Sequence, residues 1–496
     1  MEVSTLTHFK LLSVTVFLLI LSLFTAVTAS EPSTHWFLVL DFPGRDEALG
    51  IAPAPGGGVY VVGRTEAYGD NTDAFIARVN NDGTIVWFKL LGGSGVDYAE
   101  AVSSHDGFAY VIGMTYSYGS GNGDVFVAKI SPSGDLLDFY VVIVDGWQDP
   151  QDAYVDSEGN IYVTGLHRPP GGGDDAFLLK LSSDYGVDWF LSFSGPGQEM
   201  GFAVYSSGSN AYVAGFTDAE GAGFQDQMTI SVSSDGSVQW IVLVGTDGSD
   251  MAMSVTKGPG DYIYVAGEAS ISHLQGVYYR ISSDGVVDTN YMYTIFLTNN
   301  RGERGRMVFT PDNSLYFVET SSLGKNDRSP LMVHIDVQPP SGFNRYPSVL
   351  VDAPSTDIVR GVILGEDNLI YVAGTDYPSG TTDAFVYMYS PTIGDVMNWV
   401  VGGESWADIE VTADTQYVTD ASPILTITNP TSISISYVEA ESYSGNPSYT
   451  DLPNPSYSLA TDTNTPLPIP EPAIVWAITL TAVAAYLIIR NRKGGY

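Results

Sequence analysis

The chain has 496 residues, no cysteine, and a formal net charge of −37 that arises from 57 acidic against 20 basic side chains. Without cysteines no disulfide framework exists, so a chain of this length must be stabilised by a packed core. The negative field makes nucleic acid an unsuitable partner and disfavours docking on anionic lipid, and we expect no nucleic-acid binding.

Residues 1–29 predict a secretory signal peptide. Lys10 precedes the apolar run 11–26, and Val27-Thr28-Ala29 offers small residues for cleavage. The rest of the chain up to its C-terminal end is therefore expected to be extracellular.

A Tyr-Val-x-Gly tetrapeptide, or a close variant, recurs every 50 to 55 residues and predicts the architecture. The repeat tyrosines are Tyr60, Tyr110, Tyr162, Tyr212, Tyr264, Tyr316 (a degenerate copy) and Tyr371. Self-similarity at this period indicates supersecondary units that bury their apolar faces only against one another.

Residues 97–143 show the content of one unit. Short apolar runs at 99–103, 108–115, 124–130 and 136–143 are separated by turn-forming residues such as Asp106-Gly107. Four short antiparallel strands without helical periodicity are typical of a propeller blade. We therefore predict an all-β fold, a β-propeller of four-stranded blades over residues 36–403, or up to 440.

The number of blades has two interpretations. Seven units carry a full set of strands, and the additional strand at 36–41 would then reinforce or replace the outer edge of blade 7. In the alternative, residues 404–428 form a degenerate eighth blade that the strand at 36–41 completes. We favour seven blades.

Recurring tryptophans follow the turns before the last strand of several units. They are Trp87, Trp189, Trp240 and Trp399. A large ring at an equivalent place in each unit predicts packing between neighbouring blades.

The repeat resembles a known family. After Tyr-Val-x-Gly and a loop comes Asp-Ala-Phe, as at Asp73, Asp175 and Asp383, with related elements at Asp124 and Asp226. This order resembles the SBBP-type β-propeller repeat of secreted and surface microbial proteins. The resemblance implies the propeller fold and leaves the function open, because such propellers serve many roles.

A carboxylate precedes the innermost strand of every unit. These residues are Asp46, Asp97, Asp149, Glu199, Asp250, Glu303 and Asp357. They are expected to ring one mouth of the central channel, where a carboxylate either accepts backbone N–H bonds and fixes a turn or joins a Ca²⁺ site. Repetition in all units favours the turn-fixing role, and we expect no confident metal site and no other cofactor.

Blade 6 concentrates the few basic residues and breaks the repeat at Glu319 and Ser329. Its basic residues are Arg301, Arg304, Arg306, Lys325 and Arg328. Guanidinium groups bind carboxylate and sulfate in a forked geometry, so this cluster is a candidate ligand-binding site for an anionic glycan. The alternative is ion pairing with the neighbouring carboxylates.

The C-terminal quarter changes in composition. Residues 404–470 are acidic and rich in Ser, Thr and Pro, and predict an extended stalk with some β-structure at its start. Residues 473–489 carry no charge and predict a transmembrane helix, with residues 490–496 as a basic cytoplasmic tail. We expect a single-pass protein of the cell membrane with an outward-facing ectodomain.

The junction Pro470-Glu471-Pro472, followed by the apolar run and the basic cluster, resembles a PEP-type C-terminal sorting signal. The resemblance implies that a membrane protease processes the anchor. Permanent anchoring is the other interpretation.

Taken together, these features predict a cell-surface propeller that acts as a binding, adhesion or envelope structural module through its loop face, with envelope glycans or surface proteins as partners. The alternative is an extracellular polysaccharide-active or quinone-dependent enzyme. An enzyme is expected to place converging acids around a deep channel pocket, whereas a recognition module would present a shallow face.

Overall fold

The computed structural model describes residues 36–40, 44–67, 71–271, 274–296, 302–321, 329–335, 344–352, 356–377 and 382–389, and six segments between 410 and 461. The predicted signal peptide at 1–29, the predicted transmembrane helix at 473–489 and the predicted tail at 490–496 lie outside these residues. Within the described part of the chain, no helix has the length and apolar character needed to cross a membrane.

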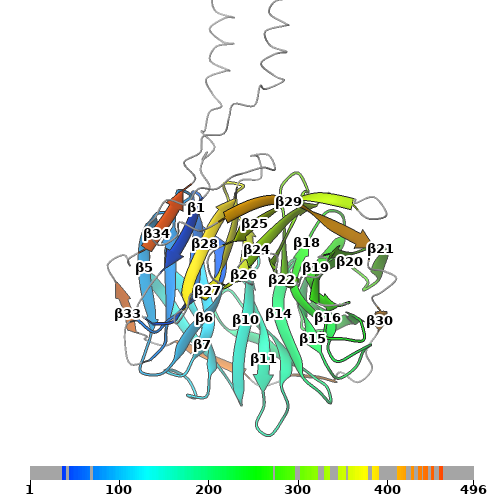
Figure 1. Cartoon of the computed structure of the whole chain (residues 1–496). Helices are drawn as coiled ribbons and strands as arrows, with labels where there is room; N and C mark the ends of the chain where they lie inside the picture. Colours follow the sequence, from blue (N-terminus) through cyan, green and yellow to red (C-terminus); the bar gives the residue numbers. More distant parts are fainter. Residues whose placement is uncertain are drawn as a thin grey trace, which may run out of the picture.

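Seven antiparallel blades of four strands form a β-propeller (Figure 1). The strands of blades 1 to 3 are β2 (Asp46–Pro53), β3 (Val59–Thr65), β4 (Asp73–Val79) and β5 (Ile85–Gly92); β6 (Asp97–His105), β7 (Phe108–Thr115), β8 (Asp124–Ile130) and β9 (Leu136–Val144); β10 (Trp147–Val155), β11 (Ile161–Arg168), β12 (Asp175–Leu181) and β13 (Val187–Ser194).

The remaining blades repeat this order from the channel outwards. Their strands are β14 (Glu199–Ser206), β15 (Asn210–Thr217), β16 (Asp226–Ser233) and β17 (Val238–Gly245); β18 (Met251–Lys257), β19 (Tyr262–Ser270), β20 (Leu274–Ser282) and β21 (Val287–Phe296); β22 (Gly302–Phe309), β23 (Leu315–Ser321), β24 (Ser329–Ile335) and β25 (Asn344–Asp352); β26 (Thr356–Leu364), β27 (Ile370–Tyr377), β28 (Asp383–Tyr389) and β1 (Trp36–Leu40).

The N-terminal strand closes the ring. β1 pairs antiparallel with β28 along its full length, with Trp36 opposite Met388, and so forms the fourth strand of blade 7. The prediction that this strand completes the outer edge of blade 7 is thereby confirmed, as is the prediction of seven blades. The alternative eighth blade is wrong, because Tyr417–Asp420 pairs with β21 of blade 5.

Tryptophans connect neighbouring blades, as predicted from their repetition. The indole Nε1 of Trp87 in blade 1 donates to the carbonyl oxygen of Pro132 in blade 2 at 3.0 Å, and Trp189 and Trp240 make the equivalent contact with Ser234 and Ser283. Each of these indoles also packs against the repeat tyrosine of its own blade. Trp399 lies outside the described residues.

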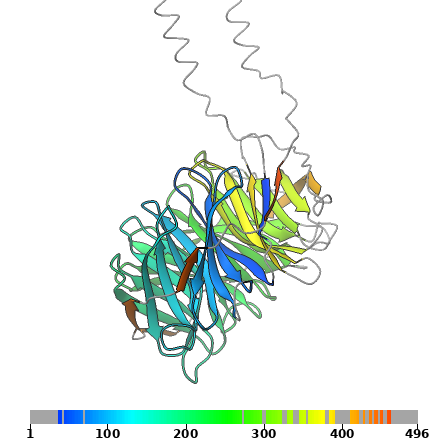
Figure 2. The ribbon, with the colours of Figure 1, turned by 90° about the vertical axis from the view of Figure 1, so that its left-hand side faces the viewer.

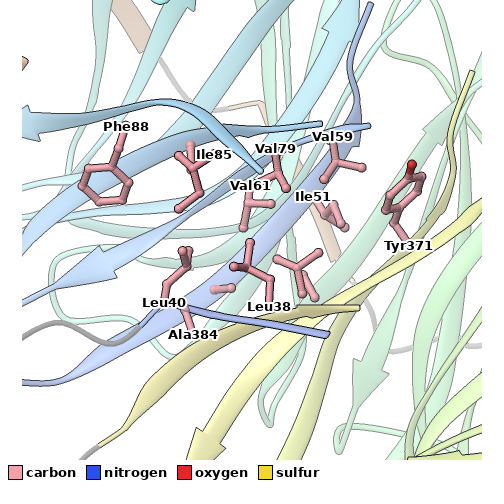
Figure 3. Packing of buried hydrophobic residues seen from close by; sticks show 14 of the residues in the cluster. Leu38, Leu40, Ile51, Val59, Val61, Val79, Ile85, Phe88, Tyr371 and Ala384 are labelled. Atoms are coloured by element: carbon pink, nitrogen blue, oxygen red, sulfur yellow. The ribbon is translucent and has the colours of Figure 1, made fainter. Parts of the chain in front are cut away.

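Trp36 supplies the same connection where the ring closes. Its Nε1 donates to the carbonyl oxygen of Asn81 in blade 1 at 2.8 Å, and its ring lies 5.9 Å from that of Tyr371. Around it, Leu38 and Leu40 pack with Ile51 and other side chains of blade 1 (Figure 3). The first strand of the chain thus carries the tryptophan that blade 7 needs.

The glycine of the repeat makes room for an irregularity in the adjacent inner strand. A Cβ on Gly63 would lie 1.8 Å from the carbonyl oxygen of Glu47, and Gly113 has the same relation to Tyr98. Both carbonyls lie next to a β-bulge, at Ala48/Gly50 and Ala99/Ala101. In the Tyr-Val-x-Gly motif, the tyrosine is therefore a core residue, and the glycine leaves space for the neighbouring bulge.

A fifth strand covers the outer edge of every blade. These strands come from the segment between residues 410 and 461, hereafter the perimeter segment, and are β29 (Glu410–Asp420), β30 (Thr426–Thr428), β31 (Ser434–Tyr437), β32 (Ala440–Ser444), β33 (Ser448–Asp451) and β34 (Tyr457–Thr461). β29 pairs with β25 of blade 6 and with β21 of blade 5. The two views agree that these strands lie at the rim (Figures 1 and 2).

The perimeter segment follows the blades in reverse order. After blades 6 and 5 it pairs with β17, β13, β9 and β5, and it ends with β34 beside β1. The composition of this stretch predicts an extended stalk, whereas six of its segments are strands of the propeller. The difference has a physical reason: an outer strand exposes unpaired backbone groups, and an extended chain of any composition can satisfy them through its own backbone.

Candidate functional site

A bulge interrupts each of the seven innermost strands at the same place. The extra residues are Leu49, Glu100, Gln151, Phe202, Met253, Arg304 (with Gly305) and Arg360, hereafter the bulge ring. A bulge bends its strand and changes the direction of a side chain, and such irregularities are common beside active sites. The propeller therefore presents one variable side chain per blade at a single level.

All seven bulge residues line a central cavity of about 560 Å³. This volume lies in the range of sites for small molecules, about 300–1,000 Å³. The lining is divided by chemistry: we call Arg304, Arg306 and Arg360 the cationic arc, Glu100, Gln151 and Asp152 the acidic arc, and Phe202 and Met253 the apolar arc. A cavity of this size with charged walls is the geometry expected of a ligand-binding or catalytic channel.

The guanidinium groups of the cationic arc lack hydrogen-bond acceptors at two atoms. The Nε atoms of Arg306 and Arg360 are buried and have no hydrogen-bond partner. Burial lowers the pKa of Arg306 to about 10, opposed by Asp152 and supported by the positive charges of Arg304 and Arg360. A buried donor without an acceptor costs about 1–3 kcal/mol, more for a charged group.

The backbone at Arg304 is held in an unusual conformation. Its φ is +58°, in the left-handed region that residues with a side chain rarely adopt. Its N–H donates to Oε2 of Glu268 at 2.7 Å, which ties the bulge of blade 6 to blade 5. Strain that the surroundings hold in place is typical of functional sites.

On the opposite side, burial raises the pKa of the carboxyl groups in and beside the acidic arc. Burial raises the pKa of Glu100 to about 8, with a further contribution from the negative charge of Asp149 and opposition from Arg64 and Arg360. Burial raises the pKa of Asp149 and that of Asp152 to about 6 in each case. Glu100 therefore carries its proton at neutral pH and can donate a hydrogen bond into the cavity.

Asp152 has a partner in the adjacent blade. Its Oδ2 accepts the backbone N–H of Val204 at 2.8 Å, which connects blade 3 to blade 4. Asp152 therefore serves packing as well as the electrostatics of the channel.

An ion pair borders the cationic arc. Arg64 donates to Oε2 of Glu47 at 2.7 Å and lies over the ring of Tyr98, 4.9 Å from its centroid. The same carboxylate is 3.9 Å from a guanidinium nitrogen of Arg360. Because Glu47 is shared between two arginines, it neutralises Arg360 incompletely.

The repeated carboxylates at the start of the inner strands are buried rather than displayed in the channel. Oδ2 of Asp97 accepts the N–H of Gly93 at 2.9 Å, Glu199 accepts that of Gly195 at 2.7 Å, and Asp250 accepts that of Thr246 at 2.6 Å. Each carboxylate thus binds the backbone four residues earlier, in the crossover between blades. This is the geometry of a group that fixes a turn.

In blade 3 a glutamine takes this position. Gln148 is fully buried, its side-chain amide donates to the carbonyl oxygen of Val144, and its N–H donates to Gly123 as that of Asp97 does to Thr72. Asp149, which the sequence predicts for this position, lies one residue further along the chain. Asp46 and Asp357 are fully buried, and the side chain of Glu303 lies outside the described residues.

Carboxyl pairs form where two blades meet. Burial and the neighbouring charge of Asp97 raise the pKa of Asp73 to about 6, and Asp226 contributes in the same direction to the raised pKa of Asp250, after burial. Among the described residues, no group of three or more acidic, histidine or cysteine side chains has the arrangement of a metal site.

Blade 6 departs from the repeat in a compensated way. Glu319 stands where the other units have glycine, and a Cβ on Gly276 of blade 5 would lie 2.3 Å from Oε2 of Glu319. Gly276 therefore leaves room for this carboxyl group, while the aspartate position of blade 5 is taken by Gln275, which pairs with Ala269. Burial and the charge of Glu268 raise the pKa of Glu319 well above its usual range.

Of the basic residues singled out in blade 6, Arg304 and Arg306 line the channel, whereas Arg301, Lys325 and Arg328 lie outside the described residues. Sequence reasoning missed Glu100, Asp152 and Arg360. The signal was available: the third residue after each repeated carboxylate is Leu49, Glu100, Asp152, Phe202, Met253, Arg306 and Arg360 in turn. This position varies in charge within an otherwise regular repeat.

No protein-family model and no curated protein matches the sequence. Solved structures with similar folds include the N10 neuraminidase-like protein of A/little yellow-shouldered bat/Guatemala/060/2010, with 13% identity, a TM-score of 0.38, and coverage of 61% of this chain and 98% of that one. Another is the xylan beta-1,4-xylosidase from Bacillus halodurans C-125, with 10% identity, a TM-score of 0.27, and coverage of 83% and 99%. At these scores the likeness supports no statement about function.

Proposed function

We propose that the chain is a ligand-binding propeller whose central channel holds a small anionic molecule. The observation that carries this proposal is that Arg306 and Arg360, two residues lining a cavity of about 560 Å³, each have a buried Nε without a hydrogen-bond acceptor. An anion would satisfy these donors and offset the mutual repulsion of the cationic arc.

The charge of the whole molecule makes this arc more selective. With a formal charge of −37, the protein repels anions from its surface, so an anion is retained only where the local charge is reversed. Glu47 neutralises part of the positive charge of the cationic arc, but its carboxylate is shared by Arg64 and Arg360. A carboxylate or sulfate has the planar or multidentate oxygens that guanidinium groups bind.

Calorimetric titration of the full-length protein in detergent micelles tests the proposal, with glucuronate, sulfate and phosphate as probes. We expect at least one of these anions to bind, and Arg306→Gln and Arg360→Gln to weaken binding tenfold or more. Arg168→Gln is the matched control, because Arg168 is paired with Asp174 and lies outside the cavity. Equal binding by all three variants would contradict the proposal.

A second candidate is hydrolysis of a glycosidic bond, and one specific observation favours it. Glu100 and Asp152 both line the cavity, and their pKa values are raised to about 8 and to about 6. A protonated and an ionised carboxyl group are the pair that glycoside hydrolysis requires. Release of a chromophore from aryl glucuronides or xylosides that Glu100→Gln abolishes would support this activity; no release from any aryl glycoside would reject it.

We further propose the cellular setting predicted from the sequence: a propeller exposed outside the cell on a single-pass C-terminal helix, with its loop face available to envelope glycans or surface proteins. The signal-like residues 1–29 and the uncharged run 473–489 support this setting. Protease digestion of intact cells tests it, because an outward-facing propeller would be degraded while the tail at 490–496 is protected.

A further inference from the structure

We propose that the anion in the channel is a hydroxyl-bearing carboxylic acid of monosaccharide size, a sugar acid, whose carboxylate contacts the cationic arc and whose hydroxyl groups contact the acidic arc. This inference rests on the proposed function, since it specifies the class of anion for the same site.

The two polar arcs face each other across the channel. The cationic arc comes from blades 6 and 7, and the acidic arc from blades 2 and 3, which lie across the ring from them. The arcs are coupled electrostatically, because the charge of Asp152 in blade 3 raises the pKa of Arg306 in blade 6, and that of Arg360 in blade 7 lowers the pKa of Glu100 in blade 2. A ligand with one acidic end and polar groups at the other end matches both sides at once.

The acidic arc is suited to hydroxyl groups rather than to a cation. A protonated Glu100 both donates and accepts, as does the amide of Gln151, and a hydroxyl group has the same double capacity. The charged and titratable groups that act on Glu100 are Asp149, Arg64, Arg360 and Glu47. These are two carboxylates and two arginines, so they provide no net negative charge that would retain an ammonium group.

The apolar arc is suited to the face of a sugar ring. Phe202 and Met253 line the cavity on neighbouring blades between Asp152 and Arg306, and Phe202 packs on Phe216 with ring centroids 5.7 Å apart. A sugar ring presents C–H groups on its faces, and an aromatic or thioether side chain covers such a face. Sulfate and phosphate have no surface of this kind.

The test compares three probes that differ in one property each, titrated into the full-length protein in detergent micelles. Glucuronate has the acid and the hydroxyl groups, glucose has the hydroxyl groups alone, and hexanoate has the acid and an apolar chain. We expect glucuronate, or its epimer galacturonate, to bind at least tenfold more tightly than glucose and hexanoate. Hexanoate binding as tightly as both sugar acids would overturn this inference and leave the proposed anion site intact, whereas sulfate, phosphate and all the acids failing to bind would remove both.

Two variants at one position separate hydrogen bonding from packing. Glu100→Leu should reduce the preference for the sugar acid over hexanoate to less than threefold, whereas Glu100→Gln, which keeps a donor and an acceptor, should retain it. Phe202→Ala provides an independent check, with an expected loss of affinity for the sugar acid and none for sulfate. An unchanged preference in Glu100→Leu would contradict the placement of the hydroxyl groups.

Discussion

The centre and the rim of this propeller are built on different rules. At the centre, each blade contributes one bulged residue, and the seven residues differ in charge and size, from Leu49 to Arg360. At the rim, every blade receives the same addition, an antiparallel fifth strand from one continuous segment. The repeated strands therefore build the frame of the propeller, while the residues that differ in charge and size between blades are placed at the bulge of each inner strand. Changes at the rim should therefore affect folding, and changes at the centre should affect binding.

The largest effect is expected at the rim. Deleting residues 404–461 would expose the outer edges of all seven blades, and unpaired edge strands promote aggregation. We expect the variant to aggregate, or to melt about 5 °C lower, since a stability loss of a few kcal/mol shifts the melting temperature of a chain of this size by about 1 °C per kcal/mol. Thermal denaturation followed by circular dichroism measures it, and deletion of residues 462–472 is the control. An unchanged melting temperature would show that the fifth strands are dispensable.

The closure of the ring is the next most sensitive point. Trp36→Ala removes a fully buried indole that packs on Tyr371 and donates to Asn81. A cost of about 3–5 kcal/mol is expected for such a truncation. Chemical denaturation measures the loss, and Trp147→Ala, at a less buried indole bonded to Tyr116, is the comparison. Equal losses in both variants would mean that closure has no special weight.

At the centre, stability and binding should separate. Arg360→Gln removes a charge whose Nε has no hydrogen-bond partner and whose ion pair with Glu47 is 3.9 Å long. We expect the free energy of unfolding to change by less than about 1 kcal/mol, because Glu47 keeps its closer pair with Arg64 and a buried charge costs desolvation, while anion binding is lost. A large loss of stability would place Arg360 in the frame rather than in the site.

The smallest and most distributed effect is the dependence of stability on pH. Carboxyl groups with a raised pKa, such as Glu100 at about 8 and Asp73 at about 6, are protonated more readily in the folded state than in the unfolded state. Their contribution is complete below the unfolded pKa of about 4 and is lost as the pH rises through 6 to 8. We expect the melting temperature to fall from pH 5 to pH 8.5.

Substitution at a single channel position sharpens this prediction. Glu100→Gln removes the group with the highest of these values, so the variant should lose less stability than the wild type between pH 6 and pH 8.5. Asp135→Asn is the control, because the pKa of this exposed turn residue is lowered and its contribution disappears only in acid. Parallel pH profiles for wild type and Glu100→Gln would contradict the raised pKa.

The frame was predictable from the sequence because it repeats. The tyrosines and tryptophans report core positions, and Trp36 carries the same role as Trp87, so the seven-bladed ring follows from local patterns. The site was only half predictable, since Arg304 and Arg306 attract notice by their charge but Glu100 and Arg360 are ordinary residues until the bulge places them in the channel. A bulge depends on pairing between strands, which a single strand does not reveal.

The perimeter segment could not be predicted, for a physical reason. Its strands have a polar composition that is typical of a linker, and their stability comes from hydrogen bonds to edges formed elsewhere in the chain. Its Asn-Pro pairs at 429, 446 and 454 fall between β30 and β31, between β32 and β33, and between β33 and β34. Such pairs are typical of turns, and here they recur where the chain passes from one blade to the next.

The perimeter segment also orders events in time. It is synthesised after all the blades, and it meets them in the sequence 6, 5, 4, 3, 2, 1 and finally 7, where β34 pairs with the first strand of the chain. A blade that has misfolded offers no outer edge, and pairing would stop there. The perimeter segment thus completes its pairing only on a finished ring, where its last strand meets the first strand of the propeller with Trp36 opposite Thr461.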